Sequence, residues 1–177
     1  MGNIGLPRSV VRLDEYSPEW RNAFEKEKEF LLQNFPDEIL EVSHGGSTSV
    51  PGMLAKPIID MFAVVTSLAD AEKMRDRLER LGYHYRGEEG VSGRLLYAKG
   101  PEEKRTHNLN LVEKSSDEWK NHISLREYYI RHPDVADEYI ELKKSLAKKY
   151  PDDRVAYRKG KKDFIGTVLE SARAEGL

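Results

Sequence analysis

The spacing of hydrophobic residues predicts helices near both ends of the chain. Trp20, Phe24 and Leu31 fall near one face of a helix that begins at Ser17-Pro18, because serine caps a helix and proline fits its first turn. A capping-box sequence predicts a second helix that ends at Gly82. After this the chain becomes wholly helical towards its C-terminus. Helices are expected there over about 115–131, from 133 to just before Pro151, and over about 158–174.

Segments with the pattern of β-strands lie between these helices. Residues 57–65, PIIDMFAVV, form a nearly continuous apolar run, which is typical of a strand buried on both faces. Further strands are expected at 9–13, 38–43, 83–86, 93–99 and 106–112. Strands with two early helices and a helical tail favour an α+β fold. Since no repeat or linker divides the sequence, residues 1–177 are expected to form one domain with a helical C-terminal region at about 116–177.

The stretch HGGSTSVPG, residues 44–52, joins two of the expected strands. Its glycines allow a sharp turn and a close approach of the backbone to a ligand. One of its hydroxyl residues is expected to cap a short helix over 50–55, whose free N–H groups would favour an anion such as phosphate. Turns of this composition are also common as purely structural features. The candidate phosphate-binding residues of the turn are Gly45, Gly46, Ser47, Thr48 and Ser49.

Asp60 is the lone acid within the apolar strand at 57–65. An ionised carboxylate in a buried strand is costly unless it is paired, hydrogen-bonded or bound to a cation. Mg²⁺, which takes oxygen ligands and retains water, would suit a carboxylate that faces a bound phosphate. In the structural alternative, Asp60 accepts hydrogen bonds from the glycine-serine turn or pairs with Lys56 or Arg94.

The overall charge and composition narrow the class of partner. The chain has 29 lysines and arginines against 31 acidic residues, so its net charge is −2. This balance disfavours a bulk nucleic-acid partner, because sequence-independent binding relies on excess positive charge. No cysteine is present, which excludes disulfides and thiolate metal ligands. The absence of cysteine also leads us to expect a cytoplasmic protein. No segment approaches the roughly 20 apolar residues of a membrane span, so we expect no membrane partner.

Five longer motifs stand out along the chain: EYSPEW (15–20), HGGSTSVPGMLAKPIID (44–60), RTHNLNLVE (105–113), LREYYIRHPDVADEYIELKKSLA (125–147) and YRKGKKDFI (157–165). Together they resemble the GrpB family, and this resemblance runs over residues 11–172. The Gly-Ser pair, twelve further residues and an acid on a hydrophobic strand also resemble the nucleotidyltransferase signature of the polymerase-β superfamily. The resemblance implies a nucleotidyltransferase-like fold, with a mixed β-sheet, flanking helices and a helical C-terminal part.

The chemistry implied by this resemblance needs more acids than the sequence contains. In active members of the superfamily the Gly-Ser turn grips a triphosphate, while two acids on the next strand, and often a third on a neighbouring strand, hold two Mg²⁺ ions. Here Asp60 is the first acid, but Phe62 stands in the place of the second. The neighbouring strand carries Asn108 and Asn110, and of the histidines that GrpB relatives tend to have there, only His107 remains. A two-metal site is therefore incomplete.

A single-metal site stays open. It would use Asp60, with His44 or His107 as a nitrogen ligand and Glu41 or Glu113 in support. Nitrogen ligands suit Mn²⁺ or Zn²⁺ better than Mg²⁺. Each histidine also has a structural interpretation, the first as a side chain that caps the turn and the second as a packed strand residue.

Basic residues near the C-terminus allow two interpretations as well. They either close over a polyphosphate or form a solvated face ahead of the last helix. Arg126, in the family's Arg-Asp-Tyr stretch, either links the helical tail to the sheet or forms one wall of a pocket. The basic residues of the run are Arg154, Arg158, Lys159, Lys161 and Lys162.

Two functions follow from these observations. The first is a metal-dependent nucleotidyltransferase-like protein that binds a nucleoside triphosphate or another phosphorylated small molecule. In it Asp60 and His44 are catalytic, Asp60 binds Mg²⁺ or Mn²⁺, and Lys56, Arg94 and His107 contact the charged ligand. The second is a non-catalytic phosphate-binding or accessory module with a protein partner. Since GrpB relatives are sometimes fused to dephospho-coenzyme A kinase, the resemblance implies coenzyme A metabolism as its setting.

Overall fold

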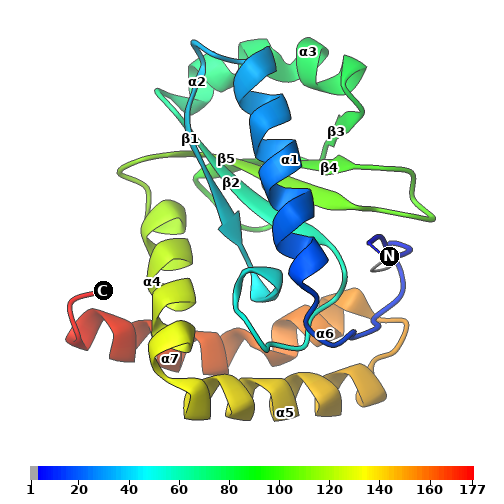
Figure 1. The fold of residues 1–177 in the computed structure, drawn as a ribbon, viewed down its shortest axis with the longest axis vertical. Helices are drawn as coiled ribbons and strands as arrows, with labels where there is room; N and C mark the ends of the chain where they lie inside the picture. Colours follow the sequence, from blue (N-terminus) through cyan, green and yellow to red (C-terminus); the bar gives the residue numbers. More distant parts are fainter. Residues whose placement is uncertain (1–3) are drawn as a thin grey trace.

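A five-stranded mixed sheet forms the centre of the protein (Figure 1). The computed structural model describes residues 4–177. The strands lie in the order β1-β2-β5-β4-β3, with β2 and β5 parallel and the other neighbours antiparallel. Their bounds are β1 (Ile39–Gly45), β2 (Ile59–Val65), β3 (Tyr83–Tyr85), β4 (Arg94–Lys99) and β5 (His107–Glu113).

Helices surround this sheet and make up the C-terminal part of the chain. In Figure 1, α1 crosses in front of the sheet, α4 runs down beside it, and α5 to α7 lie across its lower end. The bounds are α1 (Pro18–Asn34), α2 (Leu68–Ala71), α3 (Arg75–Arg80), α4 (Asp117–Arg131), α5 (Pro133–Lys149), α6 (Arg154–Gly160) and α7 (Lys162–Ala174). Short 3-10 turns span Ser47–Ser49 and Glu72–Met74. The expected α+β fold with a helical C-terminal part is confirmed.

The helices begin where their capping residues predict. Ser17 Oγ accepts a hydrogen bond from the Glu19 backbone at 3.3 Å, and Ser116 Oγ accepts one from the Trp119 backbone at 3.2 Å. These caps satisfy N–H groups that the helices themselves leave without partners. Within residues 4–177, none of the helices combines the length and the apolar character of a membrane span.

Alternate residues of β2 face two different layers. Ile59 and Met61 enter the main core beneath α1. Phe62 and Val64 point the other way and pack with residues of α4. Because side chains alternate along a strand, Asp60 shares the α4 side of the sheet. This alternation directs the carboxylate away from the main core.

Four expected elements differ in the structure. The helix expected to end at Gly82 is divided into α2 and α3 by the 3-10 turn at Glu72–Met74. Residues 9–13 form no strand, because the backbone N–H of Val11 bonds to the carbonyl of Pro151 instead of to a neighbouring strand. The glycine-serine stretch forms the three-residue 3-10 turn, so the helix expected over 50–55 is wrong. The last helix begins earlier than expected, since Asp153 caps α6, and it is interrupted at Lys161 before α7.

Candidate functional site

A cavity of about 330 Å³ opens on the side of the sheet that carries Asp60. Strands β2, β4 and β5 supply its floor, and the glycine-serine turn supplies one wall. Residues of α4 to α7 enclose the remaining sides. The helical tail therefore completes a site that begins on the sheet.

The two glycines of the turn lie against β2. A Cβ atom at Gly45 would come within 2.6 Å of the Phe62 ring. Gly46 has φ 63° and ψ −173°, a backbone region that essentially only glycine adopts. A Cβ atom there would also collide with the carboxylate of Asp60. Both positions need glycine because the backbone approaches the strand closely, and Gly46 brings the turn directly against the acid.

The hydroxyls of the turn have different partners. Ser49 Oγ donates to the Gly46 carbonyl at 2.7 Å, which closes the turn on itself. Thr48 Oγ1 lies 2.9 Å from His44 Nε2 and is buried. Ser47 Oγ accepts a hydrogen bond from Lys143 Nζ of α5 at 3.2 Å. Ser47 and Thr48 line the cavity, whereas Ser49 supports the turn from within.

The direct hydrogen-bond partner of Asp60 is an amide. Asn108 Nδ2 donates to Asp60 Oδ1 at 2.8 Å, across the parallel pairing of β2 with β5. Lys56 and Arg94 line the same cavity and interact electrostatically with the carboxylate. Asn110 accepts a hydrogen bond from Arg94 Nη1 at 2.9 Å and thereby orients the guanidinium. A neutral donor thus stabilises one carboxylate oxygen of Asp60, and the other oxygen, Oδ2, lies near the Gly46 backbone.

An aromatic stack fills the place of the superfamily's second acid. The ring of Phe62 lies parallel to that of His122, with 4.1 Å between centroids and 2° between planes. His122 Nε2 is 3.0 Å from Ser43 Oγ, which fixes the imidazole from the other side. Burial, with the positive charge of Arg126, lowers the pKa of His122 to about 3. The imidazole is therefore neutral near pH 7 and serves packing at this position.

His44 and His107 do not line the cavity. Because β5 pairs His107 with Ile59, its side chain faces α1, on the opposite side of the sheet from Asp60. The expected contact of His107 with a ligand beside Asp60 is therefore not supported. His44 stacks on Phe24 at 4.7 Å, and its Nε2 lies within hydrogen-bond distance of Thr48 Oγ1. Burial lowers the pKa of His44 to about 3 and that of His107 to about 4.

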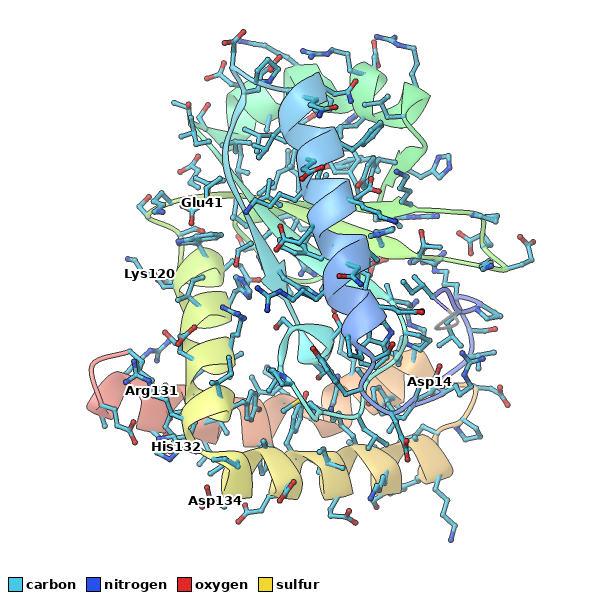
Figure 2. All side chains as sticks on the ribbon, viewed as in Figure 1. Asp14, Glu41, Lys120, Arg131, His132 and Asp134 are labelled. Carbon is cyan, nitrogen blue, oxygen red and sulfur yellow. The ribbon has the colours of Figure 1, made fainter. Side chains whose placement is uncertain are left out.

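The residues suggested for a single metal site are not brought together. Glu41 lies on the edge strand β1 (Figure 2), where it pairs with Lys114, and it is not among the residues that line the cavity. Glu113 accepts a hydrogen bond from the Leu68 backbone at 3.0 Å. Within residues 4–177, no group of three His, Cys, Asp or Glu side chains has the geometry of a metal site. A hard cation at Asp60 would therefore need phosphate oxygens and water as its other ligands.

Basic side chains dominate the cavity. Eight basic residues line it against two acidic ones, in a chain whose net charge is −2. The two interpretations of the basic run at 154–162 each apply to part of it. Three of its members line the cavity, whereas Lys159 and Lys162 are exposed to solvent. The basic residues of the lining are Lys56, Arg94, Arg105, Arg126, Lys143, Arg154, Arg158 and Lys161.

Lys143 is a site residue that the sequence reasoning missed. Its side chain is only 2% exposed, and its ammonium donates to the Leu54 carbonyl as well as to Ser47. Burial, with the nearby charge of Lys161, lowers the pKa of Lys143 to about 7. Helical spacing contained the signal, since Lys143 follows the buried Tyr139 by four residues and so shares its face.

These features define an α+β protein with a strongly basic cavity between its sheet and its helical tail. The family model described as GrpB protein matches residues 10–171, and the chain therefore belongs to the GrpB family. Glutamate-rich protein GrpB of Alkalihalophilus pseudofirmus is 37% identical, over 94% of this chain and 98% of that protein. UPF0157 protein YqkA of Bacillus subtilis is 38% identical over 94% of this chain, which spans about half (48%) of YqkA.

The fold also matches a solved structure within the family. The crystal structure of the conserved protein GrpB from Enterococcus faecalis has a TM-score of 0.85 to this chain at 38% identity. The match covers 93% of this chain and 98% of that one. The family resemblance that the sequence motifs indicated is thus confirmed.

Proposed function

We propose that the protein binds a nucleoside triphosphate or another phosphorylated small molecule in the cavity beside Asp60. The observation that carries this proposal is the concentration of eight basic side chains against two acidic ones in that cavity. Like charges in a partly desolvated space repel one another and are disfavoured by burial. A polyphosphate would relieve both costs, because its oxygens accept charge-assisted hydrogen bonds from lysine and arginine.

The glycine-serine turn supplies the first phosphate position in this proposal. Gly46 lines the cavity and has no side chain of its own to keep a ligand from its backbone, and Ser47 adds a hydroxyl. Lys143 already touches Ser47, so it would neutralise the same phosphate. Lys56 and Arg94 also line the cavity and would contact the other charged groups of the ligand.

Metal-dependent nucleotidyl transfer is a second candidate, and the placement of Asp60 favours it. The acid is half-buried at the cavity floor and next to Gly46, where one carboxylate oxygen and a phosphate could share one Mg²⁺ or Mn²⁺. Such a cation would neutralise charge on the phosphate undergoing attack. Asp60 would hold it and Asn108 would orient the carboxylate. His44 bonds to Thr48 and takes no part in this arrangement.

An accessory module without catalysis is the remaining alternative. Phe62 occupies the place of the superfamily's second acid, and the strand that might carry the third acid has Asn108 and Asn110. Both features favour binding without transfer. In that role the protein would bind its phosphorylated ligand in the cytoplasm and present it to a protein partner, with coenzyme A metabolism as one setting.

Thermal unfolding with a panel of ligands tests these proposals. The panel contains nucleotides and coenzyme A precursors, each with Mg²⁺, with Mn²⁺ and with EDTA. A ligand present at 100 times its dissociation constant stabilises the folded state by about 2.7 kcal/mol. We expect such a shift for at least one phosphorylated compound, with a smaller shift for Arg94→Gln than for the exposed control Arg80→Gln. If no compound shifts the transition, the binding proposal is wrong.

Asp60→Asn separates transfer from binding. Asparagine retains an oxygen that can accept from Asn108, so the variant is expected to fold. For an enzyme, we expect loss of turnover and of any metal-dependent part of the shift, measured with a labelled triphosphate. Turnover that is unchanged in Asp60→Asn would remove the metal mechanism. Binding without turnover in the natural chain would favour the accessory module.

A further inference from the structure

A second cavity lies beside the first and shares a wall with it. Its volume is about 680 Å³, and it is bounded on one side by residues 7–9 of the N-terminal segment. The two cavities have six lining residues in common, which we call the shared wall. They are Lys56, Glu89, Arg154, Tyr157, Arg158 and Lys161.

The shared wall carries more positive charge than its own acid can neutralise. Its one acid, Glu89, lies 3.7 Å from Arg158 and 3.6 Å from Arg8. The ammonium groups of Lys56 and Lys161 lie 5.7 and 4.6 Å from the centroid of the Tyr157 ring. The Tyr157 ring therefore has the ammonium groups of two lysines near it.

These cations affect one another. Burial, together with the charges of Arg154 and Lys161, lowers the pKa of Lys56 to about 7. Burial also lowers the pKa of Lys161 to about 8, with Arg154 and Arg158 acting in the same direction and Asp60 against it. Holding these cations together therefore costs electrostatic free energy in the unliganded protein.

Arg105 adds a buried guanidinium next to this wall. It lines the first cavity, is 2% exposed, and interacts electrostatically with Arg154. Its Nε and Nη2 atoms are buried without a hydrogen-bond partner, although Nη2 forms an ion pair with Glu102 Oε1 at 3.6 Å. Buried donors without partners cost free energy. An anion in the cavity would supply the acceptors that these two atoms lack.

We propose that the shared wall and Arg105 form a second anion site, which binds a phosphate group other than the one at Gly46 and Ser47. The inference rests on the proposed function for the first phosphate, but different segments of the chain form the second site. The first position uses the glycine-serine turn and α5, and the second uses Lys56, Arg105, α6 and Lys161. Arginines from two segments and two lysines match the several oxygens of a phosphate.

The phosphate group at the second site could come from either of two molecules, and its chemistry is the same in both cases. It belongs either to a remote part of the molecule bound at the turn or to a separate phosphorylated molecule, such as an acceptor. The second cavity would then hold the portion that continues beyond the shared wall.

Inorganic phosphate is the probe for the test. Arg154→Gln and Lys161→Gln alter the wall, while Lys159→Gln and Lys162→Gln remove exposed cations from the same segment and serve as matched controls. In the absence of phosphate we expect Lys161→Gln to raise the melting temperature, since it relieves repulsion. With phosphate we expect its stabilisation to fall several-fold against the controls. A purely structural role for Lys161 would not produce these opposite changes.

Other outcomes overturn the inference. If phosphate stabilises Arg154→Gln and Lys161→Gln as much as it does the controls, the shared wall is not an anion site. Loss of the phosphate shift in Lys143→Gln would then assign the bound phosphate to the turn. If no phosphorylated compound stabilises the natural chain, the proposed function fails as well. Should Arg154→Gln not fold, Lys161→Gln decides alone.

A competition experiment identifies the source. It uses the nucleotide that stabilises the natural chain most strongly, at saturation. A further phosphate shift that depends on Lys161 indicates a separate phosphorylated molecule. No further shift, together with weaker nucleotide binding in Lys161→Gln, indicates two phosphates of one molecule. Nucleotide binding and phosphate shifts that are both independent of Lys161 contradict the inference.

Discussion

Gly46 illustrates how a single residue sets the geometry of the site. Its backbone occupies a region open essentially to glycine alone, and its lack of a Cβ atom leaves room for the Asp60 carboxylate. The same feature brings the backbone within reach of any phosphate or cation held by the acid. Conformation and close approach therefore require glycine at the same position.

We expect Gly46→Ala to destabilise the protein by about 1–3 kcal/mol through backbone strain, with an added cost from its contact with Asp60. Gly52→Ala is the matched control, because Gly52 also has a positive φ of 80° but faces open space. Urea denaturation measures both, and ligand binding is expected to be lost in Gly46→Ala alone. Equal costs for the two variants would show that the approach to Asp60 adds nothing.

At the scale of elements, the parallel pairing of β2 with β5 decides the surroundings of the acid. The register sets Asp60 beside Asn108 and directs His107 to the other side of the sheet. Helix α5 then reaches the turn through Lys143. The carboxylate therefore has an amide partner from a strand and faces cations from the helical tail.

Asn108→Asp tests this pairing. The substitution sets two carboxyl groups at a distance where an amide now donates at 2.8 Å. Like charges so close disfavour ionisation of both, so we expect a lower melting temperature in EDTA and recovery with Mn²⁺ or Mg²⁺. Asn108→Ala, which removes the hydrogen bond without adding charge, is the control. Equal responses of the two variants to Mn²⁺ would contradict a shared position at the cavity floor.

Across the whole molecule, charge is distributed unevenly. The chain is slightly acidic overall, yet the cavity between sheet and tail is strongly basic. Burial and neighbouring cations lower the pKa of Lys56 and Lys143 to about 7 and that of Lys161 to about 8, from ordinary values of 10.5. Folding thus brings together cations that are well separated in the unfolded chain.

The stability of the unliganded protein is therefore expected to rise between pH 7 and 9.5. In this range the unfolded chain keeps protons on these lysines that the folded chain releases, so raising the pH favours folding. The charged groups that face Lys56 and Lys161 are Arg154, Arg158 and Asp60. Chemical denaturation at several pH values measures the slope, and Lys161→Gln should reduce it while Lys162→Gln should not. A flat profile would contradict the lowered pKa values.

Local chemistry made several elements predictable. Ser17-Pro18 starts α1, and the apolar run at 57–65 contains β2, because caps and periodicity act within one element. The glycine-serine turn and Asp60 were also evident from the sequence, and both line the cavity. The helix expected over 50–55 failed because the turn's serine hydroxyls bond within the turn and to α5 instead.

The sequence by itself determined the α+β class, most element boundaries and the acid within a strand, since these depend on neighbouring residues. Only the tertiary structure decided which face of the sheet each side chain occupies and which distant segments meet there. In the tertiary structure His107 lies on the opposite side of the sheet from the cavity, whereas Lys143 and Arg105 line it. The physical reason is that strand register and helix packing are set by contacts between residues far apart in the chain, which local patterns do not encode.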